Sequence, residues 1–169
     1  MAAAMDGASV RAKTGPKSPS MIELQTFPPQ PVAVIRTQAH PSERSEAVPR
    51  LCGEVFAFAR EAGLDPGRMF ALYREGTCDL EVGVEVSGPF SGTDRVAAST
   101  LPAGEVATTV HLGDYDRLGE PHRAIRAFCA ERGLALAGPF WELYGHGEAD
   151  PAKRRTDVFY LLRSEVAAG

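Results

Sequence analysis

The chain has 169 residues, of which 44% are hydrophobic and 24% charged, as is typical of one globular domain with its own core. Its net charge is −4, and because residues 1–20 carry Arg11, Lys13 and Lys17 against Asp6, this +2 segment leaves −6 on the remainder. An acidic chain lacks the clustered basic residues that nucleic acids and anionic membranes require, so we expect neither as a partner.

The cysteines and the apolar runs point to a cytoplasmic protein. Cys52, Cys78 and Cys129 are odd in number and far apart, a pattern typical of reduced thiols and not of a disulfide framework. No apolar run approaches the roughly 20 residues needed to span a bilayer. Residues 1–20 are small, polar and broken by Pro and Gly, so we expect a disordered tail there and a single domain over 21–163.

Strand and helix patterns alternate along this domain in a fixed order. The expected strands lie at residues 32–36, 69–73 and 80–86, and again at 106–111, 140–144 and 157–162. A helix is expected between the first two strands of each set, because apolar residues recur there with a period of 3.6 residues. The two apolar stripes are Val48, Leu51, Cys52, Val55, Phe56 and Ala59, and Leu118, Ile125, Phe128 and Cys129.

Turn-forming residues mark the ends of both predicted helices. Pro49 is expected in the first turn of the first helix and Pro121 early in the second, where a missing N–H costs little. Gly63 and Gly133 suit the left-handed position just after each helix.

The two sets also match in sequence, which indicates an internal duplication. Residues 57–64 align with 127–134, so that a Phe, a Gly and a Leu recur at an offset of 70. We therefore predict an α+β fold of two β-α-β-β halves, at about 21–90 and 96–163. The halves would be related by a pseudo-two-fold axis and share an antiparallel sheet, with the helices on one face and a ligand cleft between them.

One carboxylate interrupts an otherwise apolar strand in the second half. Side chains alternate along a strand, so Phe140, Glu142 and Tyr144 share one face and Trp141 faces the other way. The matching position of the first half is Ala71, so the repeat explains the strand but not the acid. A buried carboxylate needs a partner, which makes Glu142 the main candidate functional residue.

An ionised Glu142 between Phe140 and Tyr144 would attract a flat organic cation through its charge and through cation–π contacts. Two structural alternatives stay open: Glu142 lies on an exposed edge, or it pairs with a buried Arg or Lys of this chain. Tyr144 is alternatively a core residue, since Tyr73 occupies the equivalent place, and Trp141 is either packing or pocket wall. The candidate ligand-binding residues are Glu142, Phe140, Trp141, Tyr144, Tyr73 and Met69.

Other chemistry is weakly supported. His40, His111, His122 and His146 stand singly without metal-ligand spacing, so we expect no metal site, and His111 is assigned to a strand-to-helix turn. No phosphate-binding loop or dinucleotide fingerprint is present, so we expect no cofactor.

Several short motifs together resemble the GyrI-like small-molecule-binding domains, over residues 22–162. The resemblance implies the duplicated fold, a pocket between the halves, and Glu142 as the buried acid that receives cationic aromatic ligands. Two features depart from the family: Asp114 replaces its usual proline, and no DNA-binding module precedes the domain. The motifs are Leu101-Pro102-Ala103-Gly104, His111-x-Gly113-x-Tyr115-x-x-Leu118, Phe140-Trp141-Glu142-x-Tyr144, Thr156-Asp157-x-x-Tyr160 and Asp79-x-Glu81-Val82-Gly83-Val84.

Three functional hypotheses follow. The leading one is a stand-alone domain that binds lipophilic, cationic aromatic compounds for drug sensing or sequestration. The second, implied by the resemblance, is a hydrolase of cyclopropane-bearing electrophilic natural products, with Glu142 as general base and Tyr144 as hydrogen donor. The third is a modulator of a protein partner such as DNA gyrase.

Overall fold

The computed structural model describes residues 21–145 and 150–163, so the predicted tail at 1–20 lies outside the described residues. Short 3-10 turns precede both helices, at Pro41–Glu43 and Tyr115–Arg117, and a third lies at Pro151–Lys153. The strands and helices, in chain order, are β2 (Glu23–Phe27), β3 (Gln30–Gln38), α1 (Arg44–Glu61), β4 (Met69–Arg74), β5 (Asp79–Glu85), β6 (Ala97–Leu101), β7 (Gly104–Leu112), α2 (Gly119–Arg132), β8 (Leu136–Tyr144) and β9 (Arg155–Leu162).

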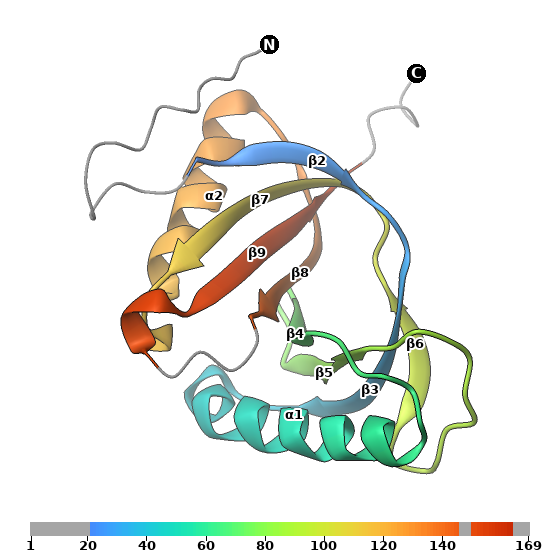
Figure 1. The fold of residues 1–169 in the computed structure, drawn as a ribbon. Coiled ribbons are helices and arrows are strands. Elements are labelled where there is room, and N and C mark those ends of the chain that lie inside the picture. The colour runs from blue at the N-terminus through green and yellow to red at the C-terminus, as the bar shows by residue number, and fades with distance from the viewer. Residues whose placement is uncertain (1–20, 146–149, 164–169) are drawn as a thin grey trace.

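The described strands form one antiparallel sheet of eight, in the order β2-β7-β9-β8-β4-β5-β3-β6. The sheet curls strongly, and both helices lie on its outer side (Figure 1). Helix α1 packs on β3, β4 and β5 and α2 on β7 and β9, so the two helices flank the central strand β8. The α+β class is confirmed, and all six predicted strands are present.

The prediction of three strands in each half was wrong, because β2 and β6 also belong to the sheet. They are its two edge strands, and β2 is exposed along most of its length, so neither carries the alternating apolar pattern of a buried strand. Strand β2 pairs with β7, and β6 pairs with β3. The predicted duplication and its pseudo-two-fold axis stay predictions.

Both helices lie where their apolar stripes predicted them, but the role given to Pro49 was wrong. Helix α1 begins at Arg44, so Pro49 lies inside it and not in its first turn. Pro49 is exposed, and water can therefore satisfy the carbonyl that its missing N–H leaves free. Gly63 and Gly133 do take the left-handed conformation after the helices, with φ of 72° and 69°.

The two faces of the sheet pack separate parts of the core. Inside the curl, Trp141 stacks on Phe159 at 5.3 Å between ring centroids, and Phe27 meets both rings edge-on. On the outer face, α1 and α2 each cover their own apolar cluster, and Phe140 packs against both clusters. The region around Phe140 therefore lies between the helices, at the centre of the sheet.

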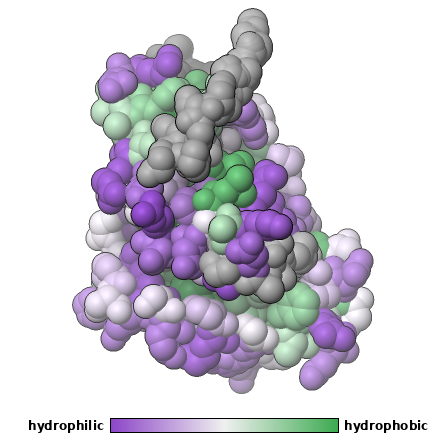
Figure 2. Space-filling model, turned by 60° about the vertical axis from the view of Figure 1, so that its left-hand side comes forward, coloured by the Kyte–Doolittle hydropathy of each residue, from purple (hydrophilic) through white to green (hydrophobic). Residues whose placement is uncertain are grey.

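The surface is mainly hydrophilic on the face shown in Figure 2, where apolar residues appear in small separate groups. Among the described residues, no helix combines the length and apolar character required to cross a membrane.

Gly83 of β5 provides a test of this sheet. A Cβ at Gly83 would lie 1.9 Å from the carbonyl oxygen of Ala33 on the neighbouring strand. Because this neighbour is backbone and both strands are buried, we expect Gly83→Ala to lower the free energy of unfolding by roughly 2–4 kcal/mol in urea denaturation.

The matched control is Gly53→Ala on α1, where a Cβ meets nothing within 4 Å. There we expect a gain of roughly 0.5–1 kcal/mol, because Ala favours the helix over Gly. Equal effects of the two substitutions would contradict the close approach of β3 and β5.

Candidate functional site

Glu142 lies at the centre of the sheet. Its partners in the strand register are Ala71 on β4 and Val158 on β9, both fully buried, and Glu142 itself is 7% exposed. The alternative that placed it on an exposed edge was therefore wrong. A carboxylate in this position loses most of its hydration and must be satisfied by protein groups.

Two side chains satisfy Glu142. The Nε2 atom of His122 lies 2.7 Å from Oε2, and the Tyr144 hydroxyl donates to Oε1 at 2.6 Å. The alternative of an internal Arg or Lys partner was thus also wrong, because the partners are a histidine and a tyrosine. Each carboxylate oxygen has a short hydrogen bond, as expected for charge-assisted bonds.

His122 was missed as a site residue by the sequence analysis. Its second nitrogen, Nδ1, lies 2.7 Å from the Tyr160 hydroxyl, so that one continuous chain of hydrogen bonds joins Tyr160, His122, Glu142 and Tyr144. The sequence does contain a sign that His122 faces the sheet, because it falls on the inward stripe of α2, four residues after Leu118. A titratable residue in an apolar stripe needs a buried partner.

Stacked aromatic rings form a wall beside this chain. Tyr73, Phe140 and Tyr160 come from the neighbouring strands β4, β8 and β9, with ring centroids 5.3 and 4.8 Å apart. The Arg44 guanidinium lies 4.7 Å from the centroid of the Tyr73 ring, and that of Arg126 lies 5.1 Å from the Tyr160 ring. The wall thus already makes cation–π contacts with side chains from both helices.

An irregularity in β8 determines which side chains of this strand face the helices. The register with β9 shifts between Leu136 and Phe140, and Gly138 within this stretch has a φ of 123°. Such bulges redirect the residues that follow them and are frequent near functional sites. Beyond the shift, Phe140 pairs with Tyr160 and stacks on it.

The tyrosines of the site keep their protons at neutral pH. Burial and then the charge of Glu142 raise the pKa of Tyr144 far above its usual value. Burial raises the pKa of Tyr160 to about 12, and the pKa of Tyr73 is raised for the same reason, with a further contribution from Glu142. The hydroxyls of all three can therefore donate hydrogen bonds.

Arg68, just before β4, holds the end of β8 that carries the site. Its guanidinium donates to the backbone oxygens of Leu143 and Tyr144 at 2.9 and 3.2 Å and pairs with Asp157 at 3.0 Å. Arg155 also pairs with Asp157. This brace fixes the backbone on either side of the Tyr144 side chain.

The structure brings most of the predicted site residues, but not all of them, to the same face of the sheet as Glu142. Phe140, Tyr144 and Tyr73 surround Glu142, and Met69 is half-buried against the same apolar cluster. Trp141 is fully buried on the opposite face of the sheet, so we leave it out of the proposed site. Tyr115, which is 45% exposed, meets Tyr144 edge-on at 5.8 Å, from the turn before α2.

The remaining histidine and cysteine assignments concern packing. His111 is the penultimate residue of β7, and its Nε2 lies 3.0 Å from the Asp114 carbonyl oxygen that follows the strand. Cys52 and Cys129 are buried, and Cys78 is half-buried in the β4–β5 turn. Among the described residues, no group of three or more His, Cys, Asp or Glu side chains is arranged to hold a metal ion.

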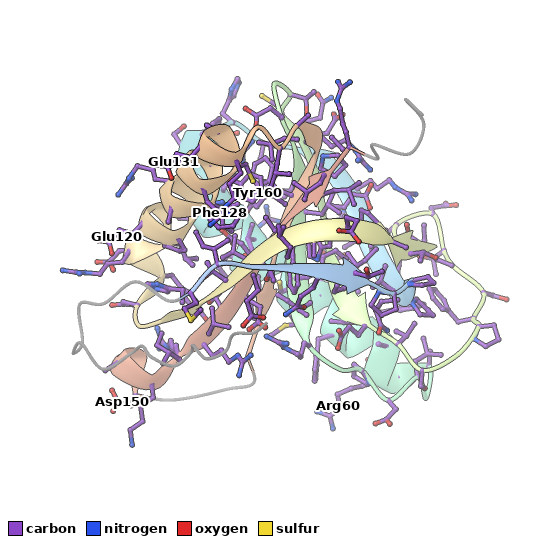
Figure 3. All side chains as sticks on the ribbon, turned by 90° about the horizontal axis from the view of Figure 1, so that it is seen from above. Arg60, Glu120, Phe128, Glu131, Asp150 and Tyr160 are labelled. Atoms are coloured by element: carbon purple, nitrogen blue, oxygen red, sulfur yellow. The ribbon has the colours of Figure 1, made fainter. Side chains whose placement is uncertain are left out.

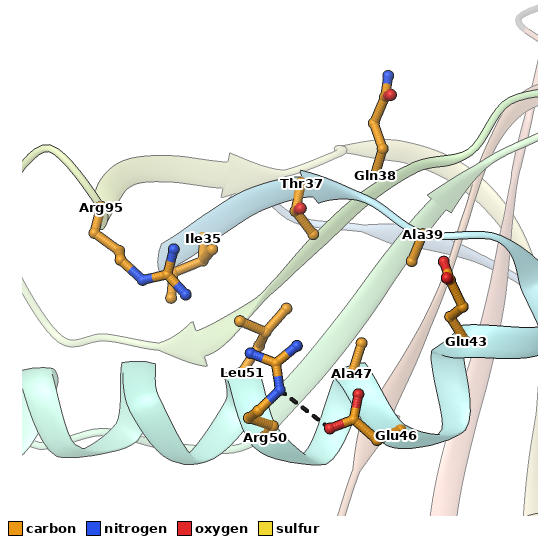
Figure 4. A pocket seen from close by; sticks show the side chains of 10 residues that line it. All are labelled: Ile35, Thr37, Gln38, Ala39, Glu43, Glu46, Ala47, Arg50, Leu51 and Arg95. Atoms are coloured by element: carbon orange, nitrogen blue, oxygen red, sulfur yellow. Dashed lines mark hydrogen bonds and ion pairs between the residues drawn. The ribbon is translucent and has the colours of Figure 1, made fainter.

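A separate pocket of about 340 Å³ lies between α1 and β3 (Figure 4). None of the residues around Glu142 lines it. Its charged side chains are engaged with each other or with near neighbours: Glu46 pairs with Arg50, and Arg95 with Glu54. We therefore place the candidate site at Glu142 and not in this pocket.

Comparison with known proteins agrees with this fold. The sequence profile of the family described as GyrI-like small molecule binding domain matches residues 20–163. None of the curated proteins matches the chain.

Three solved structures are similar. The EcmrR C-terminal domain has a TM-score of 0.74 at 19% identity, covering 86% of this chain and 98% of that one. A hydrolase encoded by lin2189 from Listeria innocua has a TM-score of 0.60 at 14% identity, and the match covers 87% of this chain and 94% of that one. SAV2435 bound to tetraphenylphosphonium has a TM-score of 0.61 at 13% identity, and the match covers 85% of this chain and 94% of that one. At these identities the likeness concerns the fold alone.

The brace at β8 generates a prediction on stability. Burial alone would raise the pKa of Asp157, but hydrogen bonds from Arg155 and Arg68 outweigh it and lower the pKa below its ordinary value. A lowered pKa stabilises the fold fully above the unfolded-state pKa of about 3.9, and this contribution is lost as pH falls through the folded-state pKa. We expect Asp157→Asn to cost about 1–3 kcal/mol at neutral pH and less with falling pH below about 4.

Urea denaturation across this pH range measures the effect, with the exposed Asp116→Asn as control. A stability difference that stays constant down to about pH 3 would contradict the assignment of the brace.

Proposed function

Because the chain belongs to the GyrI-like small-molecule-binding domain family, we propose that it binds lipophilic organic cations at Glu142. The observation that carries the proposal is the pairing of this buried carboxylate. Within the described part of the chain, its hydrogen-bond partners are His122 and Tyr144, and no Lys or Arg forms an ion pair with it. When His122 is uncharged, neither partner supplies a positive charge that would neutralise an ionised Glu142.

The aromatic wall favours a flat or aryl-bearing cation over a small inorganic one. Tyr73, Phe140 and Tyr160 present stacked rings, and Tyr144 and Tyr115 add a further edge-on pair. Ring faces attract cations, and this attraction is strongest where water is displaced. Arg44 and Arg126 already exploit it on the same rings.

One of the similar structures was solved with a ligand of this class. This structure is SAV2435 bound to tetraphenylphosphonium, an aryl cation. EcmrR was solved both as its C-terminal domain and in a complex with DNA. We infer that this chain serves drug sensing or sequestration, with the site between α1 and α2.

Tetraphenylphosphonium is the probe for this proposal, and Glu142→Gln is the informative substitution. Gln keeps the shape and removes the charge, so we expect the cation to bind more weakly by roughly 1.5–3 kcal/mol, or about ten- to hundredfold in Kd. Neutral triphenylphosphine oxide should lose much less. Calorimetric titration measures both.

The control is Glu131→Gln, a carboxylate that projects from the outer side of α2, away from Tyr160 (Figure 3). It should leave both affinities unchanged. Equal affinity of the cation for wild-type protein and Glu142→Gln would refute the anchor.

A second candidate function is hydrolysis of strained, cyclopropane-bearing electrophiles, and the short contact between Tyr144 and Glu142 favours it. Glu142 would take a proton from water while the water oxygen attacks the ring carbon. The C–C bond electrons would then move to the conjugated carbonyl, whose oxygen receives a proton from a tyrosine hydroxyl. Tyr144 is such a donor, since its raised pKa keeps it protonated.

Incubation with a cyclopropanoid natural product, followed by mass spectrometry, tests this reaction. The expected product gains one water, and Glu142→Gln and Tyr144→Phe should each slow its formation by about a hundredfold or more, the usual contribution of a general acid or base. Product formation at equal rates by both variants and wild type would remove the reaction from this site.

A further inference from the structure

We propose that His122 determines the charge class of ligand that this site accepts: uncharged His122 admits a cation beside Glu142, and protonated His122 excludes it. This inference rests on the proposed binding of organic cations. His122 belongs to α2, donates towards the carboxylate and meets Phe140 and Tyr160 of the aromatic wall edge-on.

The hydrogen bonds fix one form of the uncharged ring. An ionised carboxylate can only accept, so Nε2 of His122 must carry the hydrogen that points to Glu142. The other nitrogen, Nδ1, then accepts from the Tyr160 hydroxyl at 2.7 Å. In this form both ring nitrogens are satisfied, and the pair of His122 and Glu142 carries one negative charge.

Protonation changes the charge without breaking this arrangement. The added hydrogen lies on Nδ1, and the Tyr160 hydroxyl, which can donate or accept, turns to accept it. Nε2 continues to donate to Glu142. The pair is then neutral overall, and an incoming cation would meet a carboxylate already neutralised by an adjacent imidazolium.

The groups packed against His122 are aromatic rings. Its side chain is 16% exposed, and Phe140 and Tyr160 meet its ring edge-on from β8 and β9. Tyr160 keeps its proton because its pKa is raised.

Within the described ranges, the charged groups that contact the aromatic wall are two arginines. From α2, Arg126 lies over Phe140 and Tyr160 and is paired with Glu75. From α1, Arg44 lies over Tyr73. Both stay cationic at all pH values of interest, whereas histidine ordinarily titrates between about pH 5 and 8.

A linkage between protons and ligand follows. A cation bound beside Glu142 repels an imidazolium at Nε2, so binding releases the proton from His122 wherever the free site is protonated. Wherever the free site carries this proton, affinity for the cation should fall with falling pH by up to about tenfold for each pH unit. A neutral ligand has no such repulsion, so the site at acidic pH would prefer neutral compounds.

Tetraphenylphosphonium is again the probe, because its charge does not depend on pH. Calorimetric titrations between pH 5 and 8, in two buffers that differ in ionisation enthalpy, report both affinity and protons released. In wild-type protein we expect affinity to fall with pH and proton release to approach one for each ligand. His122→Gln, which keeps a neutral donor towards Glu142, should bind with an affinity that is nearly independent of pH.

The outcomes separate this inference from the function on which it rests. Binding at pH 8 that does not weaken on acidification, or proton release that persists in His122→Gln, would overturn the role of His122 and leave the cation site standing. Absence of binding at pH 8 would overturn the proposed function and this inference together. If the variant does not fold, nuclear magnetic resonance of the wild-type His122 ring, with and without the probe, decides the same question, because the probe must lower the pKa of the ring.

Discussion

The burial of one carboxylate at the centre of the sheet constrains the rest of the site. Removing an ion from water costs several kcal/mol, and Glu142 is flanked on both sides by fully buried neighbours. Its hydrogen-bond donors must therefore come from above the sheet and from its own strand. His122 supplies the first and Tyr144 the second. The position of α2 relative to β8 is thus tied to the hydrogen bond between His122 and Glu142 and not only to apolar packing.

The same constraint is met without an Arg or Lys partner for the carboxylate among the described residues. A hydrogen bond from a neutral donor such as the Tyr144 hydroxyl satisfies a carboxylate lone pair without cancelling the charge, whereas an internal arginine would do both. The arginines that do lie nearby, Arg44 and Arg126, contact ring faces, and Arg126 is paired with Glu75 on the turn after β4. Positive charge is therefore held around the aromatic wall while the carboxylate stays free of an Arg or Lys ion pair within the described residues.

Much of the fold could be predicted from the sequence, because six strands and both helices carry strong apolar periodicity. The misses have physical causes. Strands β2 and β6 lie at the sheet edges and depend on pairing with distant segments, which local pattern does not encode. Pro49 was misplaced because α1 extends before its apolar stripe. In the site, Glu142 is recognisable from the sequence as a carboxylate in an apolar strand. Its partner His122 is harder to recognise, because a single histidine without metal-ligand spacing gives no comparable signal. His122 is recognisable only by its place on the inward stripe of α2.

The pairing of the edge strands also has a consequence for synthesis of the chain. Strand β2 pairs with β7 across about 80 residues, and between them lie the whole of α1 and four strands. As the polypeptide leaves the ribosome, β2 emerges before β7 and stays without its partner until about 80 further residues have been made. Pairings of such long range close large loops and are slow to form. A nascent chain therefore carries β2 unpaired while the segment up to β7 is translated, and the exposed position of β2 among mostly polar side chains limits its association with other chains during that interval.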